Sequence, residues 1–511
     1  MKVKNFISLS MIVAGMAAII ACSSDDPKQD YNPLIDDPKP EEQPTEPGGS
    51  TAGRNEQYRP QIHFTPAKNW INDPNGMVYH DGVYHLFYQY NPQGNDWGNM
   101  SWGHATSTDL MHWTEQAVAL TRDELGDIFS GSAVIDKDNT AGFGANAMVA
   151  LYTSASGAQQ QSLAYSTDGG KSFTRYAGNP VIKNDDDNLR DPKVFWHEPS
   201  QQWVMALAKG WKMGVELYGS TDLKAWRHLS TFFVPLAGRP SLQWECPDLI
   251  QMGDKWVMLV SVNPGGPVLG SGTMYFVGQF DGTTFTADGA VEGEAQTPRW
   301  LDYGMDNYAG VTWSNTGDHR VMIGWMNNWQ YAGSVPCSPW RSAMTLPREL
   351  TLREVDGQLL LCSTVVGEID QISDPWQTTT GDISAKDAYQ LRIRLDLSKN
   401  STLTLSNASD ERFAIDINAA ARSLTVHRTS ATGKTSFNGT FSIPSMQAPL
   451  NVSGNSVTLD LFVDQSSVEL FTTDGAMSMT NLVFPTTIYN HLSVTGADYE
   501  AQVRQLRSVW K

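Results

Sequence analysis

The chain has 511 residues, 40% of them hydrophobic, which is enough for two or three domains with large buried cores. Its formal net charge of −19 excludes a nucleic-acid-binding protein, because an acidic surface repels phosphates. Apart from Cys22 there are three cysteines, an odd number at spacings that fit neither a disulfide framework nor a zinc site. We therefore expect no bound metal.

Residues 1–22 have the features of a signal peptide. Lys2 and Lys4 precede the apolar stretch FISLSMIVAGMAAII, and small residues follow near the cleavage point. The apolar stretch is too short for a good membrane span. The ending IIAC resembles a bacterial lipobox, which would make Cys22 the lipid-bearing first residue. An ordinary secretory signal with an incidental cysteine is the alternative.

Residues 23–55 are rich in Pro, Asp, Glu and Gly and contain almost no apolar residues. Such a segment cannot bury enough surface to fold, so we expect a disordered tether between a lipid anchor and the folded protein. The acidic residues directly after Cys22 resemble a surface-export signal of bacterial lipoproteins. The expected location is therefore the outer membrane, at the cell surface, although the periplasmic side is also possible.

A strand–turn–strand unit recurs five times between residues 56 and 350. The units contain Val78, Val134, Val194, Leu249 and Val311 at equivalent places, about 55–62 residues apart. Four of the five are followed by a second hairpin with an Asp-containing turn: ATSTDLMHW, AYSTDGGKSF, YGSTDLKAW and VGQFDGTTF. Four strands per repeat predict the blades of a five-bladed β-propeller. A solenoid is the competing interpretation, but solenoid repeats are usually shorter and more regular.

The pattern changes after about residue 375. Four segments alternate apolar and polar residues between turns: 389–398, 412–429, 457–475 and 481–494. This alternation predicts a β-sandwich over 375–511, joined to the propeller by a linker at 351–374. The sandwich could support the propeller or bind sugar; no exposed aromatic cluster stands out in it, which favours support.

Three acids lie just before inner strands of the predicted blades. Asp73 precedes the first strand of blade one, Asp191 that of blade three and Glu245 that of blade four, and a proline follows each within two residues. First strands of propeller blades line the central channel, so these carboxylates should converge at one end of the axis. Proline fixes its own φ and favours an extended residue before it, which would stiffen the site.

Clustered carboxylates suit glycoside hydrolysis, in which one acid is a nucleophile or base and another protonates the leaving oxygen. Two other interpretations compete with this one. The acids could be ordinary turn residues, but three at one phase of a repeat are unlikely by chance. They could hold a metal, but that would require more oxygen ligands at close spacing.

Several motifs resemble those of glycoside hydrolase family 32, which includes invertases, inulinases and levanases. They run in order over residues 60–500: WINDPNG, FYQYNP, WGNMSWGHATSTDLMHW, FSGS, RDPKVFW, ECPDL, DYGMDNYAG, WMNNW and DQSSVELF. The resemblance implies a propeller followed by a sandwich, as the repeats also predict. It implies a retaining hydrolase of β-D-fructofuranosyl linkages in levan, inulin or sucrose, without a cofactor.

The resemblance also implies roles for individual residues. Asp73 would be the nucleophile, Glu245 the acid/base, and Asp191 a stabiliser of the transition state that binds fructose hydroxyls. Arg190 would bind substrate and modulate the acid. Further residues would shape the fructose pocket: Asn72, Gln89, Trp97, Phe129 and Ser130, with Asp302 and Trp325 as second-rank candidates.

Two alternatives to a fructan hydrolase remain from the sequence. A fructosyltransferase shares the chemistry and differs only in using a sugar as the acceptor. A non-catalytic glycan-binding propeller would not require three placed acids. The expected partners are a fructan or fructo-oligosaccharide and, through Cys22, a membrane; a monomer is expected.

Overall fold

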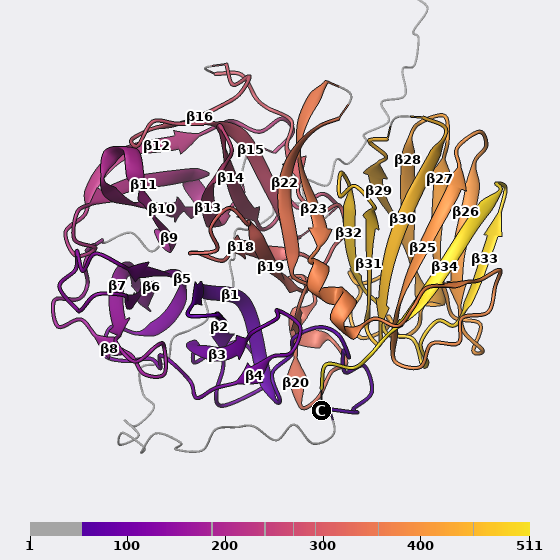
Figure 1. The fold of residues 1–511 in the computed structure, drawn as a ribbon, viewed down its shortest axis with the longest axis horizontal. Helices are drawn as coiled ribbons and strands as arrows, with labels where there is room; N and C mark the ends of the chain where they lie inside the picture. Colours follow the sequence, from indigo (N-terminus) through magenta and orange to yellow (C-terminus); the bar gives the residue numbers. More distant parts are fainter. Residues whose placement is uncertain are drawn as a thin grey trace, which may run out of the picture. The chain divides into compact units, whose positions relative to one another are not determined.

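The computed structural model describes residues 54–184, 188–239, 242–268, 270–291, 293–355, 357–452 and 454–510. Strands make up almost all of its regular structure (Figure 1). The helical elements among the described residues are short 3-10 turns: η1 (Glu198–Ser200), η2 (Gly210–Lys212), η3 (Ala332–Ser334), η4 (Gly367–Ile372) and η5 (Ser430–Thr432).

The predicted five-bladed propeller is confirmed, because five antiparallel sheets follow one another along the chain. Blade one contains β1 (Asn69–His80), β2 (Val83–Tyr90), β3 (Ser101–Ser107) and β4 (Thr114–Glu115). Blade two contains β5 (Asp127–Asp136), β6 (Ala147–Ser156), β7 (Ala158–Ser166) and β8 (Thr174–Arg175). Blade three contains β9 (Arg190–His197), β10 (Gln202–Lys209), β11 (Gly214–Ser220) and β12 (Arg227–Phe233).

The last two blades each carry one additional short strand. Blade four contains β13 (Trp244–Met252), β14 (Lys255–Val262), β15 (Gly272–Phe280), β16 (Phe285–Ala287) and β17 (Arg299–Trp300). Blade five contains β18 (Tyr308–Thr312), β19 (Val321–Met326), β21 (Ala343–Met344), β22 (Arg348–Val355) and β23 (Gln358–Val365).

The ring closes on itself at blade one. The inner strands β1, β5, β9, β13 and β18 surround the axis, and β1 contacts both β5 and β18 (Figure 1). In addition β20 (Trp340–Arg341), which lies between β19 and β21 of blade five in sequence, pairs in parallel with residues 69–70 of β1. The first blade is therefore completed by residues that come some 270 positions later in the chain.

In each of the first four blades an aspartate holds the turn of the second hairpin. Asp109, Asp168, Asp222 and Asp281 each accept backbone N–H bonds from residues two to four positions further on. Such a turn satisfies backbone donors that would otherwise have no partner at the blade edge. The recurring Asp of the sequence is thus a turn residue with a local structural role.

The linker predicted at 351–374 is wrong for most of its length. Residues 351–365 belong to β22 and β23, which pair with each other as the outer hairpin of blade five. Blade five lacks the Asp-turn hairpin of the other blades, so the repeat in the sequence does not mark its outer strands. Only residues after 365, including η4, connect the propeller to the sandwich.

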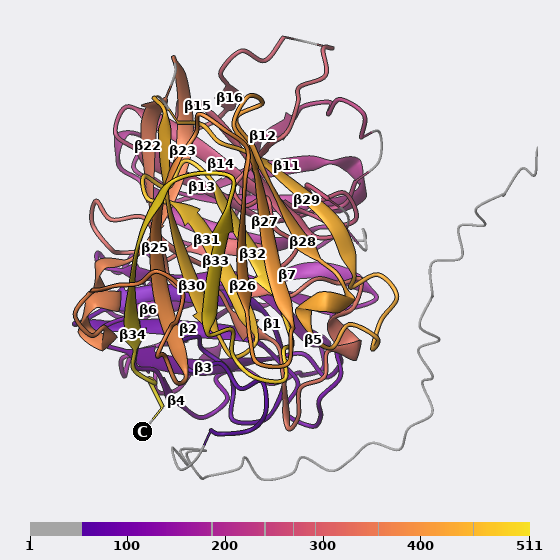
Figure 2. The same cartoon turned by 90° about the vertical axis from the view of Figure 1, so that its right-hand side faces the viewer.

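The C-terminal domain is the predicted β-sandwich (Figure 2). One sheet has the order β24 (Gln377–Thr378), β34 (Tyr499–Leu506), β25 (Ala388–Asp396), β30 (Ser456–Asp464), β31 (Ser467–Thr472) and β32 (Ser478–Leu482). The other has the order β29 (Ile443–Pro449), β28 (Ser423–Arg428), β27 (Arg412–Asn418), β26 (Ser401–Ser406) and β33 (His491–Thr495).

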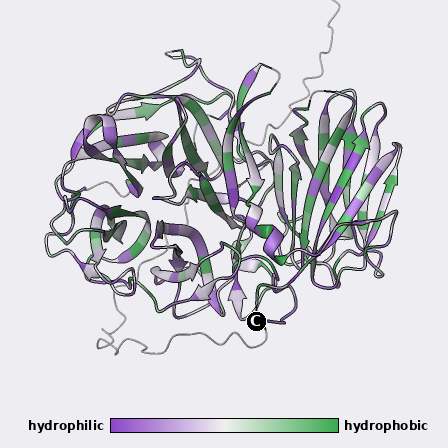
Figure 3. Ribbon diagram, viewed as in Figure 1, coloured by the Kyte–Doolittle hydropathy of each residue, from purple (hydrophilic) through white to green (hydrophobic). Residues whose placement is uncertain are grey.

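The alternation seen in the sequence builds the core of the sandwich. Leu391, Ile393 and Leu395 alternate along β25 and are fully buried, while the residues between them are more polar. Figure 3 shows the same alternation of hydrophobic and hydrophilic residues along the strands of this domain. Burial of every second side chain is what a two-sheet packing requires.

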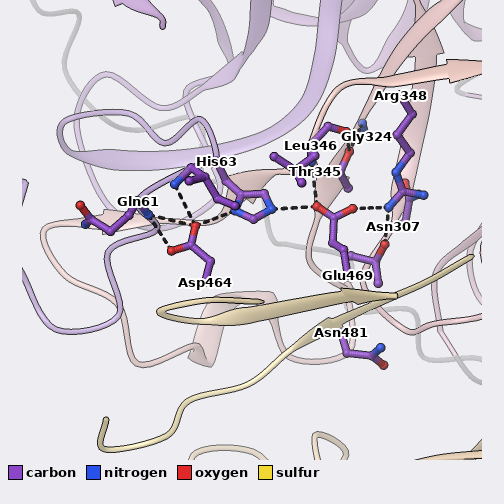
Figure 4. A network of polar contacts seen from close by, with 12 residues as sticks. Gln61, His63, Asn307, Gly324, Thr345, Leu346, Arg348, Asp464, Glu469 and Asn481 are labelled. Carbon is purple, nitrogen blue, oxygen red and sulfur yellow. Dashed lines mark hydrogen bonds and ion pairs between the residues drawn. The ribbon is translucent and has the colours of Figure 1, made fainter. Parts of the chain in front are cut away.

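A buried ionic network joins the sandwich to the propeller (Figure 4). His63, just before blade one, contacts Asp464 through Nδ1 and Glu469 through Nε2, each at 2.7 Å. Arg348 of β22 bonds both Glu469 and, at 2.9 Å, Asp302. All five side chains are almost completely buried, so each charge depends on its partners.

This network should make stability depend on pH. The carboxylates of Asp464 and Glu469 raise the pKa of His63 from 6.5 to about 9, although burial opposes the shift. A raised pKa gives stabilisation that is complete below pH 6.5 and is lost as the pH rises through 9; here it amounts to about 3 kcal/mol. Chemical denaturation between pH 6 and 9.5 should show this loss. His63→Gln should remove it, whereas the exposed His319→Gln should retain it; parallel curves for wild type and His63→Gln would contradict the assignment.

The predicted signal peptide, its lipobox and Cys22 lie outside the described residues. The tether predicted at 23–55 extends at most to residue 53. Arg54 already belongs to the folded part, because its guanidinium bonds Glu115 at 2.5 Å and stacks on Trp510. Among the described residues, the structure has no helix of sufficient length and hydrophobicity to cross a membrane.

Candidate active site

The three acids identified in the sequence meet at one end of the propeller axis. Each inner strand has a bulge at this end, where two residues oppose one residue of the neighbouring strand. The bulges lie between residues 71 and 74, 128 and 131, 190 and 193, 245 and 248, and 308 and 311. A bulge redirects side chains out of the normal alternation, and five of them at one level form the floor of a site.

The acids do not occupy identical positions in these bulges. Glu245 is the last paired residue before its bulge, Asp191 is one residue further in its own, and Asp73 is two residues further. The extended backbone expected before the prolines is wrong for Asp191, whose φ is +63°. This left-handed conformation is strained for a residue with a side chain and is typical of functional sites.

Asp73 is held by two hydrogen bonds from neighbouring side chains. Ser130 Oγ donates to Oδ2 at 2.7 Å, and Asn72 Nδ2 donates to Oδ1 at 3.1 Å. Burial raises the pKa of Asp73, and the nearby Glu245 adds to the increase, whereas the two hydrogen bonds lower it. The carboxylate is therefore both fixed in orientation and poorly solvated, as a nucleophile should be.

Glu245 is surrounded by hydrogen-bond donors. Arg190 donates to Oε1 from Nη2 at 2.8 Å and from Nε at 3.2 Å, and Gln243 approaches the same oxygen at 3.4 Å. The hydroxyl of Tyr308 donates to Oε2. These contacts hold the Glu245 carboxyl group in one orientation, which suits a group that must transfer a proton to and from a reacting oxygen.

Asp191 lies close to the other two acids. Its Oδ2 accepts the backbone N–H of Cys246 at 3.0 Å and lies 3.9 Å from Arg190 Nε. Burial raises the pKa of Asp191; Arg190 opposes this, and the charges of Glu245 and Asp73 add to it. The thiol of Cys246 is 3.6 Å from both Asp191 Oδ2 and Asp73 Oδ2, which places the two carboxylates around one small volume.

The charges of this cluster do not cancel. Three acids face one cation, Arg190, in surroundings that exclude most water. Burial is the main cause of the raised pKa values of Asp73 and Asp191, and this excess of negative charge adds to it. It also favours a reaction whose transition state is positively charged, such as the oxocarbenium-like state of glycoside cleavage. Within the described residues, no group of His, Cys, Asp and Glu is arranged to hold a metal ion.

The axis is closed below the acids. Lys193 Nζ pairs with Asp248 at 3.0 Å and also bonds Thr312, all of them on inner strands further along the channel. A cavity of about 440 Å³ at the opposite end of the axis is lined in part by these same residues and does not include the acids. Substrate can therefore reach the carboxylates from one face only.

The five first-rank pocket residues lie around Asp73. Asn72 and Ser130 touch it directly. Gln89 is buried and bonds Asn75 and the carbonyl of Ile128, so it supports the inner strands of the first two blades. Trp97 is partly exposed and packs edge-on against Phe129, with ring centroids 6.1 Å apart, at the rim.

The two second-rank candidates are not placed to contact substrate. Asp302 is buried at the junction with the sandwich, where it accepts hydrogen bonds from Arg348 and Thr480. The motif DYGMDNYAG, which begins with Asp302, ends in the inner strand of blade five. Asp302 itself lies six positions before that strand, and its side chain points to the sandwich domain. Trp325 is fully buried beneath the site, between Trp70 and Tyr308.

The sequence analysis missed Tyr308 as a member of the site. Tyr308 begins β18 and is the residue of blade five that corresponds to Glu245 of blade four and Arg190 of blade three. Its equivalent position in the repeat was the signal that could have revealed it. Tyr308 is a neutral hydrogen-bond donor and carries no charge that would mark its position in the sequence.

Carboxyl groups gathered at one end of a five-bladed propeller can perform the acid and nucleophile chemistry of a glycoside hydrolase. Comparison with known proteins agrees. Residues 63–363 match the description "Glycosyl hydrolases family 32 N-terminal domain", and residues 363–510 match "Glycosyl hydrolases family 32 C terminal". The chain belongs to glycoside hydrolase family 32, whose general mechanism is retaining.

Relatives cover most of the chain. It is 42% identical to a levanase of Bacillus subtilis over 89% of this chain and 71% of the relative. It is 40% identical to an extracellular exo-inulinase of Aspergillus niger over 89% of this chain and 95% of the relative. The crystal structure of exo-inulinase from Aspergillus awamori aligns with a TM-score of 0.84 at 36% identity, covering 90% of this chain and all of that one.

A solved structure with a bound sugar is also similar. Fructofuranosidase from Schwanniomyces occidentalis, complexed with fructose, aligns with a TM-score of 0.76 at 32% identity. The alignment covers 88% of this chain and 98% of that chain.

Proposed function

We propose that this enzyme hydrolyses β-D-fructofuranosyl linkages of fructans such as levan or inulin. The observation that carries the proposal is the cluster of Asp73, Asp191 and Glu245 at one end of the propeller axis, with Arg190 and Tyr308 bonded to Glu245. The relatives named levanase and exo-inulinase support a fructan as the substrate. Sucrose contains the same fructosyl unit and is a smaller substrate for the same chemistry.

In the first step Asp73 attacks the anomeric carbon of the fructosyl unit while Glu245 gives a proton to the leaving oxygen. The bond between that carbon and the leaving oxygen breaks, and an ester to Asp73 forms. In the second step Glu245 takes a proton from water, the water oxygen attacks the same carbon, and Asp73 leaves as a carboxylate. Asp191 does not react; it accepts hydrogen bonds from fructose hydroxyls and stabilises the positive transition state.

The test is incubation of the purified enzyme with levan, inulin and sucrose, followed by chromatography of the products over time. We expect fructose or fructo-oligosaccharides from at least one of the two polymers. Fructose alone from the earliest times indicates cleavage at chain ends, and a ladder of oligosaccharides indicates internal cleavage. Failure to release sugar from levan and inulin would contradict the proposal.

We also propose that the protein is exported, works as a monomer and is held at the outer membrane by a lipid on Cys22. The signal-like residues 1–22 and the acidic, proline-rich segment after them support this location. The extracellular relatives support export in general. A surface anchor would place the enzyme where it meets polymeric substrate first.

A further inference from the structure

Three aromatic side chains are exposed on the face of the propeller that carries the acids. The exposed large hydrophobic residues among the described ones are Trp97 (37%), Trp211 (49%), Phe233 (49%) and Val291 (55%). The three aromatics lie at strand ends on the level of Asp73 and Glu245: Trp97 follows β2, Trp211 follows β10, and Phe233 ends β12. Exposed aromatic rings gathered on one functional face indicate a binding surface.

Trp211 is linked to the acid/base residue by a short chain of contacts. Its backbone N–H donates to Asn188 Oδ1 at 3.2 Å, and the same oxygen accepts Arg190 Nη1 at 3.3 Å. Arg190 in turn bonds Glu245. The preceding Gly210 permits this approach, because a Cβ there would lie 1.5 Å from Asn188 Oδ1. Trp211 is therefore fixed at the rim on the Glu245 side.

Phe233 continues the same surface outward. It pairs across the sheet with Gly214, three residues after Trp211, on the outermost strand of blade three. Three strand spacings separate β9 from β12, or about 14 Å. The three residues therefore form a radial row across the face of blade three, in the order Arg190, Trp211 and Phe233. The length of this row is about that of two or three sugar units.

The side on which this row lies determines what it can bind. In the proposed reaction Glu245 protonates the leaving oxygen, so the leaving part of the substrate must lie on the Glu245 side, opposite Asp73. In a fructan that part is the rest of the polymer. The C–H faces of its furanose rings can pack on the negative faces of exposed aromatic rings.

We propose that Trp211 and Phe233 form a platform for the leaving chain, binding fructosyl units beyond the one next to the scissile bond. This inference rests on the proposed function and adds a preference for polymeric over disaccharide substrates. The platform requires little rearrangement, because Trp211 is already positioned through its backbone and Asn188.

The experiment compares Trp211→Ala, Phe233→Ala and the double variant with wild type. The substrates are sucrose, whose leaving group is a single sugar, and levan or inulin chains of five or more units. We expect Trp211→Ala to raise KM for the long chains by about 5- to 30-fold, with kcat and the kcat/KM for sucrose within twofold of wild type. Val291→Ala, which removes an exposed apolar side chain elsewhere, should change none of these values.

Two kinetic results would overturn the platform. An unchanged KM for long chains in the double variant would show that the rings do not contact the polymer. A fall in kcat/KM for sucrose as large as the fall for long chains would show that Trp211 acts only by supporting Arg190. Retardation in gels containing levan or inulin, measured in an Asp73→Asn background, tests binding without turnover. In this background we expect the variant without both rings to be retarded less by levan or inulin than the variant that keeps them. This result does not depend on whether the enzyme cleaves fructans.

Discussion

Asp73→Asn is expected to lower kcat for every fructosyl substrate by about 10⁴- to 10⁶-fold. The amide has nearly the shape of the carboxylate but cannot form the covalent ester through which the reaction proceeds. Loss of a nucleophile cannot be compensated by Asp191, whose Oδ2 is held by the backbone of Cys246. Initial rates on sucrose and levan, with enzyme concentrations raised to detect slow turnover, measure the effect.

The fold of this variant should remain intact. Burial disfavours the ionised Asp73, so a neutral side chain removes a repulsive charge rather than a stabilising one. We expect the melting temperature to be unchanged or higher. Asp81→Asn, at an exposed turn at the other end of the same strand, is the matched control and should retain full activity. Turnover of Asp73→Asn within tenfold of wild type would refute the nucleophile assignment.

Glu245→Gln is expected to cost about 10²- to 10⁴-fold in kcat/KM for sucrose and fructans, because an amide cannot protonate the leaving oxygen. The loss should depend on the leaving group. Fructosyl fluoride releases fluoride without a strong need for protonation, so the first step should be nearly normal for it. Fluoride release measured by electrode distinguishes the two substrates.

The second step of this variant offers an independent check. Water needs Glu245 as a base, whereas azide does not, so added azide should accelerate turnover of the fluoride and yield fructosyl azide. Equal losses on sucrose and fructosyl fluoride, with no response to azide, would show that Glu245 is not the acid/base. In that case the contacts of Tyr308 and Arg190 with Glu245 would have only a structural role.

Much of the architecture followed from the repeat. The spacing of the units predicted five blades, and the alternation after residue 375 predicted the sandwich. The phase of the acids also predicted that they converge, because inner strands of a closed ring must meet at the axis. These are properties of periodicity, which a single sequence displays directly.

The details that the sequence did not reveal depend on contacts between distant segments. The prolines after Asp73 and Asp191 indicate an irregular strand at these positions. The exact position of each bulge, however, is set by pairing with the neighbouring strand. Asp302 belonged to a motif that also contains Tyr308, and only the fold shows that one residue faces the sandwich and the other faces Glu245. The outer hairpin of blade five was taken for a linker because no repeat marked it.

The pairing of β20 with β1 has a consequence for the order of assembly during synthesis. The strand that carries Asp73 gains its last neighbour only when residues 340–341 have been made, and the segment before it is held by Asp464 still later. Catalytic competence therefore cannot build up gradually from the N-terminus. A nascent chain that lacks its last fifty residues should therefore be inert.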